Sequence, residues 1–405
     1  SEIAGNWEGT TNQPSIWGFD AWVQMFADIS AKDYLDVARR FNPYRFDAKA
    51  IVSTAKNAGM KYLVVTSKHH DGFCMYDSKL TDFDIVDVTP FKRDILKELS
   101  EECKKQGLKF CVYYSIPDFH NSELPQKYNP YHYHSRPKKN ADMNKYIDYM
   151  CGQISELLTN YPDVGMLWFD LGDSDAFKEP GKSVATVIGA KRIMETINSI
   201  NPKVLVNNRL DTIADFTTPE QYIPGEKSKS YFEACMTMGK AWGYTTYDTV
   251  KPVSTILTNL CDIAHKGGNL LLNIGPKGDG SVPDMQLTTL NAVGNWMKYN
   301  GEAIYGTEPG PWPEIPEWGR ITRKGNTLYI MIFQQPRIGF TTFRGLNKMP
   351  LKVRQLDTRM GTFNLRPRIL DDRLWILIQE SFIQKEPLVF ALDFAPGVLD
   401  AINYK

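Results

Sequence analysis

From about residue 30 to residue 300, the chain repeats one pattern: a stretch of helical periodicity, then a glycine, then a short apolar run. Glycine in the left-handed conformation commonly ends a helix, and the runs that follow have the length of strands buried on both faces. The predicted strands are residues 61–66, 109–114, 164–169, 203–206 and 269–273, and the predicted helices include 96–105, 184–200 and 256–265. Such repeats form parallel sheets, and five or more of them in about 250–300 residues favour an α/β fold, the (β/α)8 barrel of the TIM type.

After about residue 300 the chain changes to short β-rich runs without helical periodicity. Residues 308–316 carry four prolines, which indicates a linker. The predicted strands beyond it are residues 327–333, 351–356, 374–378 and 388–394. We therefore predict two domains, a catalytic barrel of residues 1–308 and an antiparallel β-sandwich of residues 309–405.

The composition argues against several classes of protein. Lys plus Arg and Asp plus Glu both number 47, and this zero net charge disfavours a nucleic-acid-binding protein. No run of 18 apolar residues is present, so no membrane span is expected. The six cysteines form no Cys-x-x-Cys pair, and we expect them to be mostly free, buried thiols. Aromatic residues reach 12%, which fits contact with carbohydrate or a large core.

The most informative single residue is Asp170, the carboxylate that ends the run 164–169. An isolated aspartate at a strand end more often caps the next helix or pairs with an arginine than takes part in catalysis. Here, however, polar clusters follow all five predicted strands, and in a parallel barrel such clusters converge on one face. Alternation along the strand also places Trp168 on the same side as Asp170. The other clusters are residues 67–72, 115–120, 207–209 and 275–280.

Each cluster has a simpler explanation. His69 and His70 are adjacent, so on an extended chain they point in opposite directions, and no third ligand stands at an obvious spacing. We therefore predict no metal site, and expect at least one of the two to hydrogen-bond a substrate hydroxyl. Arg209 could merely pair with Asp211. We interpret residues 273–280 as a tight turn, because they lack the phosphate-binding motif of nucleotide sites.

A second carboxylate is expected from a later loop, and Glu220 and Glu233 are the two candidates. Two carboxylates among aromatic and histidine side chains suit glycoside hydrolysis. One of them attacks the anomeric carbon or activates water, and the other protonates the leaving oxygen. The acid needs a raised pKa, which a largely apolar loop provides.

Several segments together resemble the α-L-fucosidases of glycoside hydrolase family 29. They are residues 44–47, 58–62, 66–73, 89–94, 167–170, 233–244 and 267–276, and they extend over roughly residues 20 to 310. The resemblance implies a retaining exo-α-L-fucosidase that acts on fucosylated glycans without a cofactor. It also implies a covalent fucosyl-enzyme intermediate on Asp170.

The resemblance further assigns roles to individual residues. Glu220 is similar to the acid/base residue of many members, although that loop varies in the family and Glu233 stays the alternative. Trp168 and Trp22 would wall the fucose pocket, and Trp242 would pack against the fucose methyl group. The residues implied to bind fucose hydroxyls are His69, His70, Tyr114 and Arg209.

Two departures from the family pattern stand near the start of the chain. The first barrel strand of the family ends in His-Trp-Gly, and no such segment precedes Trp17, so we expect that strand to be missing from this sequence. Ala21 stands where many members have a glutamate. No signal peptide is visible at Ser1, and the resemblance implies a secreted, periplasmic or lysosomal enzyme. The sequence does not indicate an oligomeric state.

Two alternative functions are kept beside the fucosidase. A non-catalytic fucose-binding protein on the same barrel is disfavoured because both carboxylates are present. A metal-dependent sugar isomerase or hydrolase needs a shell of carboxylates and histidines. Linkage specificity would depend on residues 120–138 and 173–181, and the first of these loops either forms a subsite or only covers the barrel.

Overall fold

The structure is a computed structural model that describes residues 22–26, 29–128, 139–161, 163–246, 248–359 and 361–402. The described residues form two compact units. The first unit takes in those of Ser1–Thr218, Gly239–Val250 and Asn273–Leu287, and the second takes in those of Pro219–Met238, Lys251–Leu272 and Thr288–Lys405. The predicted domain boundary after residue 308 therefore does not coincide with the division between the units.

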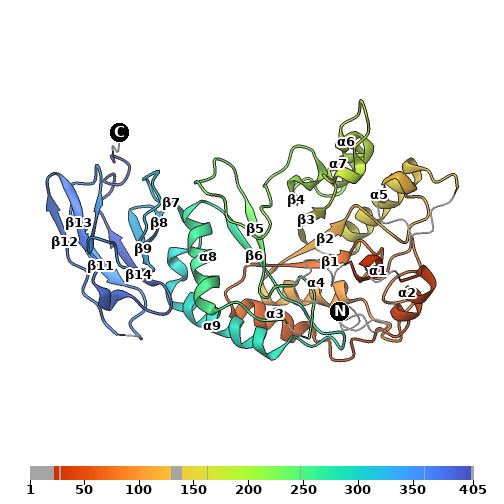
Figure 1. The fold of residues 1–405 in the computed structure, drawn as a ribbon, viewed down its shortest axis with the longest axis horizontal. Helices are drawn as coiled ribbons and strands as arrows, with labels where there is room; N and C mark the ends of the chain where they lie inside the picture. The colour runs from red at the N-terminus through yellow and green to blue at the C-terminus, as the bar shows by residue number, and fades with distance from the viewer. Residues whose placement is uncertain are drawn as a thin grey trace. The chain divides into compact units, whose positions relative to one another are not determined.

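The first unit contains a parallel sheet of four strands in the order β1, β2, β3 and β4 (Figure 1). The strands are β1 Tyr62–Lys68, β2 Lys109–Ser115, β3 Val164–Asp170 and β4 Leu205–Val206. Each lies within two residues of its predicted bounds. Their order in the sheet is their order in the sequence, as expected for successive helix–strand units.

Helices separate these strands, and local signals set their ends. The helices are α1 Val23–Phe26, α2 Ala31–Ala38, α3 Ala48–Asn57, α4 Ile95–Gln106, α5 Met143–Asn160, α6 Val184–Val187 and α7 Ala190–Ile200. At the start of α4, the Asp94 side chain accepts the N–H of Lys97, a capping bond that stabilises a helix by about 1 kcal/mol. At its end, Gly107 has a φ of +77°, which lets the chain turn directly into β2.

The predicted helix 184–200 is broken in the structure. Gly189 separates α6 from α7 and has a φ of +69°. A Cβ atom at this position would lie 2.7 Å from Cδ1 of Ile147 in α5. A glycine is therefore required here both by the left-handed backbone and by the close approach of α5.

The remaining predicted barrel strand belongs to a separate small sheet. β5 Glu233–Thr237 and β6 Asn269–Asn273 form a two-stranded sheet, and α8 Val253–His265 and α9 Asp284–Asn300 flank β6 in the sequence. Strand β6 has its predicted bounds. In the described part of the chain, the strands before residue 300 thus form sheets of four and two strands, without a closed eight-stranded sheet.

The C-terminal residues form two antiparallel sheets, which confirms the predicted change of character. One has the order β11-β14-β9-β8-β7 and the other the order β10-β13-β12. Their strands are β7 Glu308–Pro309, β8 Gly319–Lys324, β9 Thr327–Ile332, β10 Phe340–Phe343, β11 Lys352–Gln355, β12 Pro367–Leu370, β13 Arg373–Leu377 and β14 Leu388–Asp393. Both sheets contribute to one buried apolar cluster, which includes Ile330, Phe343, Ile376 and Phe390.

The proline-rich segment 308–316 is not a free linker, contrary to the prediction. Glu308 and Pro309 pair with β8 as an edge strand, a position that proline tolerates. Trp312 is buried in the C-terminal core, and its indole N–H donates to the carbonyl oxygen of Arg344 at 2.7 Å. Lys227 donates to the carbonyl oxygens of Gly310 and Trp312. Prolines here shape a packed edge, which composition alone does not distinguish from a linker.

All six cysteines are free and all except Cys151 are buried, as predicted. Large cores of this kind stabilise the fold without disulfides, because each fully buried apolar side chain contributes about 1.5–3 kcal/mol. Among the described residues, no helix has both the length and the apolar character needed to cross a membrane.

One buried acid in the first unit affects stability. Asp84 is fully buried, and its Oδ1 accepts the N–H groups of Val86 and Asp87, both at 2.8 Å. Among the residues that the structure describes, none forms a hydrogen bond with its Oδ2. One oxygen each from Asp77, Asp84 and Asp87 lie within 4.8 Å of one another. Burial, to which the charges of Asp87 and Asp77 add, raises the pKa of Asp84 to about 6.

Asp84→Asn is therefore expected to stabilise the protein at neutral pH. An unfolded aspartate has a pKa near 3.9, so the proton is held more tightly in the folded state, and stability falls as pH rises from about 4 to about 6. Removing the charge is expected to raise the free energy of unfolding at pH 7 by about 3 kcal/mol, since the shift is about two pKa units at ~1.4 kcal/mol per unit. Thermal unfolding between pH 4 and 8 measures this. Asp82→Asn, at an exposed position of the same loop, is the matched control. An unfolding temperature of Asp84→Asn at or below that of the wild type at pH 7 contradicts the prediction.

Candidate active site

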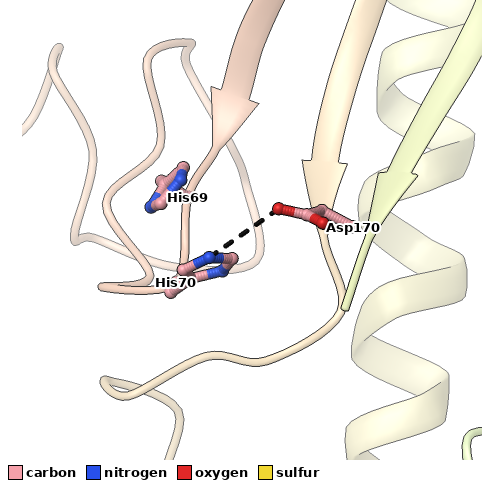
Figure 2. A group of neighbouring side chains, drawn as sticks. All are labelled: His69, His70 and Asp170. Carbon is pink, nitrogen blue, oxygen red and sulfur yellow. Dashed lines mark ion pairs between the residues drawn. The ribbon is translucent and has the colours of Figure 1, made fainter. Parts of the chain in front are cut away.

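The carboxyl ends of three neighbouring strands bring predicted site residues together. His69 and His70 directly follow β1, and Asp170 is the last residue of β3. Ser115, the last residue of β2, pairs in register with Asp170, so these strand ends are level. Figure 2 shows both imidazole rings near the Asp170 carboxylate, with His70 Nε2 lying 3.8 Å from Asp170 Oδ2.

Three donors surround the carboxylate of Asp170. The Tyr113 hydroxyl donates to Oδ2 at 2.6 Å, and Arg209 Nη1 donates to Oδ1 at 2.5 Å. The N–H of Leu171 also donates to Oδ1, at 2.9 Å. Leu171 has a φ of +54°, a left-handed conformation that costs a leucine roughly 1–2 kcal/mol. The surrounding contacts thus maintain a strained turn, and they hold the carboxylate in one orientation, as a nucleophile requires.

Arg209 is fixed on several sides. Its Nε donates to Thr218 Oγ1 at 3.0 Å, and its guanidinium carbon lies 4.7 Å from the centre of the Trp168 ring, a cation–π contact. Asp211, the alternative partner considered from the sequence, accepts the N–H of Ala185 instead. Arg209 therefore pairs with Asp170, and its positive charge balances the negative charge of the carboxylate.

An aromatic face adjoins the carboxylate. The Tyr113 ring stacks on Trp168 with centroids 5.7 Å apart and on His69 with centroids 5.5 Å apart. Tyr113 and Trp168 are register partners on β2 and β3, so their side chains leave the sheet on the same side. Stacked rings of this kind offer the flat, partly apolar surface that a sugar ring contacts.

The surroundings of His70 disfavour its charged form. It is 3% exposed, and its Nδ1 lies 2.6 Å from Ser115 Oγ. Burial, followed by the nearby His69, Lys68 and Arg209, lowers the pKa of His70 well below its usual value. The Trp22 ring lies 4.6 Å from the His70 ring, which places Trp22 at this end of the sheet; its role as a wall of the pocket stays a prediction.

Tyr114 was predicted to bind substrate, but the structure places it in the core. It is fully buried, and its hydroxyl donates to Gln153 Oε1 at 2.8 Å. Tyr113 takes its place beside Asp170. The physical reason is alternation: Ser115 pairs with Asp170, so the residue two before Ser115 shares its face, whereas Tyr114 faces the other side.

Asn207 supports the site in a way that the sequence did not indicate. Its side-chain oxygen accepts the N–H of Phe169 at 3.0 Å, and its side-chain amide donates to the Phe169 carbonyl at 2.8 Å. Strand β4 ends one residue earlier, at Val206. The Asn207 side chain therefore continues the ladder beside β3 and fixes the backbone immediately before Asp170.

A metal-binding arrangement also has to be considered. One ligand atom each from His69, His70 and Asp170 lie within 4.8 Å of one another, so the third ligand that the sequence did not reveal comes from β3. The same carboxylate, however, pairs with the cationic Arg209. Because a second cation on this carboxylate would be repelled, the arrangement suits a sugar hydroxyl better than a metal ion.

The two candidate acids belong to the second unit. Glu233 lies in β5 and is 1% exposed, whereas Glu220 is half-buried. Glu220 forms a bridge with Cys235, in which the N–H of Gln221 donates to the Cys235 carbonyl at 2.9 Å. The assignment of Glu220 as the acid, with Glu233 as the alternative, stays a prediction.

Trp242 and the glycine-rich turn lie together in the first unit. Trp242 is half-buried, and its carbonyl oxygen accepts a hydrogen bond from the Asn273 side chain at 2.7 Å. A Cβ on Gly275 would lie 2.8 Å from the backbone of Gly243. The N–H of Arg45 donates to the Asp279 carbonyl at 2.8 Å. These contacts support the structural interpretation of residues 273–280.

Comparison with known families assigns the chain. A family model described as Alpha-L-fucosidase matches residues 5–302. The chain belongs to the alpha-L-fucosidase family. The family match begins earlier than residue 20, where the recognised motifs begin. Residues 1–21, which include Ala21, and residues 129–138 of the loop after β2 lie outside the described residues.

Three relatives illustrate the similarity to alpha-L-fucosidases. The structure of alpha-L-fucosidase isoenzyme 1 from Paenibacillus thiaminolyticus is 35% identical, with a TM-score of 0.81 over 92% of each chain. Human plasma alpha-L-fucosidase is 32% identical over 328 residues, which are 76% of this chain and 66% of the human protein. A family 29 enzyme from Bacteroides thetaiotaomicron, solved as a trapped covalent intermediate with 2-fluoro-fucosyl fluoride, is 25% identical, with a TM-score of 0.80 over 96% of this chain and 91% of that chain. The chain thus spans about two thirds of the length of the human relative.

Proposed function

We propose that the protein is a retaining, exo-acting α-L-fucosidase that removes terminal α-L-fucose from oligosaccharides or glycoconjugates. The observation that carries the proposal is the Asp170 carboxylate, which lies at a strand end beside an aromatic face and accepts hydrogen bonds from Tyr113 and Arg209. Family membership supports it, as does the similarity to a fucosidase trapped as a covalent intermediate.

The proposed reaction has two steps. In the first, an oxygen of Asp170 attacks the anomeric carbon while the bond to the leaving oxygen breaks, and Glu220 gives that oxygen its proton. In the second, water attacks the same carbon, the Glu220 carboxylate takes up the released proton, and the bond to Asp170 breaks. Two inversions return the α configuration of fucose.

The residues around Asp170 would bind the sugar. His69, His70 and Arg209 offer polar groups to hydroxyls, and Tyr113 replaces Tyr114 in this set. The stacked ring of Trp168 supports contact with the pyranose, and the predicted roles of Trp22 and Trp242 as apolar walls are retained in the proposal.

We extend the proposal to fold and location. The four-stranded sheet would belong to a (β/α)8 barrel of residues 1–308, followed by a β-sandwich of residues 309–405; the TM-score of 0.81 to a bacterial alpha-L-fucosidase supports this architecture. We expect a secreted, periplasmic or lysosomal enzyme, in line with the human relative, which is named a plasma enzyme.

Proton NMR of a reaction with 4-nitrophenyl α-L-fucoside tests the function. We expect α-L-fucose to be the first anomer released, with β-L-fucose appearing later by mutarotation, and EDTA to leave the rate unchanged. Initial release of the β anomer excludes a retaining mechanism. Fucose binding without any release of product would instead favour the non-catalytic alternative.

A further inference from the structure

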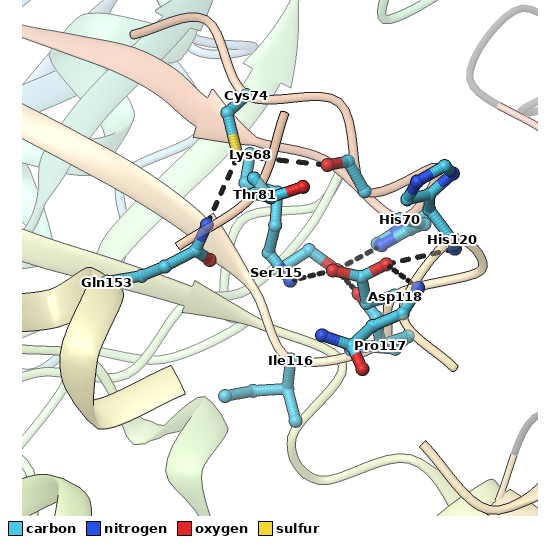
Figure 3. A network of polar contacts seen from close by, with 12 residues as sticks. Lys68, His70, Cys74, Thr81, Ser115, Ile116, Pro117, Asp118, His120 and Gln153 are labelled. Carbon is cyan, nitrogen blue, oxygen red and sulfur yellow. Dashed lines mark hydrogen bonds and ion pairs between the residues drawn. The ribbon is translucent and has the colours of Figure 1, made fainter. Parts of the chain in front are cut away.

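Ser115 lies between two hydrogen-bond partners at the carboxyl end of β2 (Figure 3). Its Oγ lies 2.6 Å from His70 Nδ1, and it donates to the carbonyl oxygen of Pro117 at 2.9 Å. A serine hydroxyl carries one proton, and a carbonyl oxygen can only accept. The two contacts can both be hydrogen bonds only when Ser115 donates to Pro117 and the Ser115 oxygen accepts the N–H of His70 Nδ1.

This arrangement determines what the other ring nitrogen can do. A neutral imidazole with its proton on Nδ1 carries a lone pair on Nε2. His70 Nε2 lies 3.8 Å from Asp170 Oδ2, which is beyond hydrogen-bond range, and Tyr113 already donates to that oxygen. The Nε2 lone pair and the Asp170 carboxylate are then two acceptors that face each other; Figure 2 shows the His70 ring directed toward the carboxylate. A ligand between them has to supply the donor.

A buried ion pair and backbone hydrogen bonds hold the loop that follows β2. Lys68 and Asp118 form an ion pair at 3.1 Å in which both side chains are fully buried. Asp118 Oδ1 accepts the N–H of His120 at 2.9 Å, and the N–H of Phe119 donates to the His70 carbonyl at 2.8 Å. The carbonyl group that takes the serine proton is thus fixed relative to the His70 backbone.

We propose that Ser115 is a positioning residue that fixes His70 with its proton on Nδ1, so that Nε2 accepts a hydrogen bond from a hydroxyl group of the bound sugar. The inference rests on the proposed function, since it takes the ligand to be a sugar. It adds a requirement: the group facing His70 has to be a donor, so a hydroxyl fits this position, and a fluorine or a methoxy group does not.

Nitrogen NMR of histidine-labelled protein tests the tautomer without any substrate. The chain has six histidines, and the signals of His70 are assigned by their loss in His70→Asn. We expect the Nδ1 shift of a protonated nitrogen and the Nε2 shift of a nitrogen with a lone pair. In Ser115→Ala, which removes the acceptor, the proton is expected to move partly or wholly to Nε2. A wild-type protein with the proton on Nε2 overturns the inference.

Kinetics then separates a positioning role from a structural one. Ser115→Ala is expected to raise KM for an aryl α-L-fucoside about tenfold and to change kcat less, the size of one lost hydrogen bond. Ser115→Thr keeps the hydroxyl and should restore part of the loss. Ser100→Ala is the matched control, because Ser100 is buried and donates to the Lys97 carbonyl at 2.9 Å in helix α4.

Analogues that carry fluorine in place of one ring hydroxyl complete the test. When fluorine replaces the hydroxyl that faces His70, the analogue should bind the wild type about tenfold more weakly than the parent sugar does. This difference in affinity should be smaller in Ser115→Ala. Equal losses in both proteins contradict the inference. If the wild type hydrolyses fucosides normally but carries the proton on Nε2, the inference about Ser115 is wrong and the proposed function stands. A proton on Nδ1 in a protein that hydrolyses no fucoside overturns the proposed function instead.

Discussion

Replacing Asp170 by glycine is expected to lower kcat for an aryl α-L-fucoside by about four orders of magnitude while the fold survives. The glycine variant cannot form the covalent intermediate, and Tyr113 and Arg209 then face a space without a carboxylate. Initial rates, with circular dichroism as a check of folding, measure this effect. Asp175→Asn serves as a control, because the Asp175 side chain lies in the segment after β3 and is 87% exposed.

Adding azide shows whether Asp170→Gly is inactive because the nucleophile is missing or for another reason. In Asp170→Gly, azide can enter the vacated space and attack the anomeric carbon once, so the expected product is β-L-fucosyl azide. Activity close to that of the wild type in this variant contradicts the assignment of Asp170. Formation of the α azide would contradict it as well, because that product requires an intermediate on the enzyme.

Replacing Glu220 by glutamine is expected to lower the rate on fucosyl oligosaccharides by about 10²–10⁴-fold, the usual contribution of a general acid. The rate of hydrolysis of fucosyl fluoride should fall less, because fluoride leaves without needing a proton. Azide should restore turnover and give α-L-fucosyl azide, since the intermediate on Asp170 still forms and azide replaces the water that needs a base.

Glu233→Gln provides the matched comparison for that result. Glu233 lies in β5 and is buried, so circular dichroism has to accompany the rates. We expect its rates to stay within a few fold of the wild type on both kinds of substrate. If Glu233→Gln shows the dependence on leaving group and Glu220→Gln does not, the roles of the two residues are reversed.

The elements around the site could be predicted because their signals are local. Apolar runs after helix-ending glycines marked β1, β2, β3 and β6 to within two residues. Asp170 stood out as a single carboxylate at the end of such a run. Trp168 was placed on its side of the sheet by alternation alone, which the Arg209 contact with Trp168 and Asp170 bears out.

Other parts of the site depended on contacts between distant segments. Choosing between Tyr113 and Tyr114 requires the register of β2 against β3, and neither strand's sequence alone specifies that register. The support from Asn207 appears only where β4 ends beside β3. Ser115 and His70 are 45 residues apart, and nothing in either segment indicates the partner of the other.

The sequence by itself determined the helix–strand repeat, the change to β structure after residue 300, and the acid at the end of β3. These features depend on hydrophobic periodicity and on residues that end helices, and both act over a few positions. The tertiary structure decided which side chains meet that acid, why Gly189 breaks a helix, and that the proline-rich segment is a packed edge. These outcomes depend on register and close packing between segments far apart in the chain. Local propensity carries no information on either.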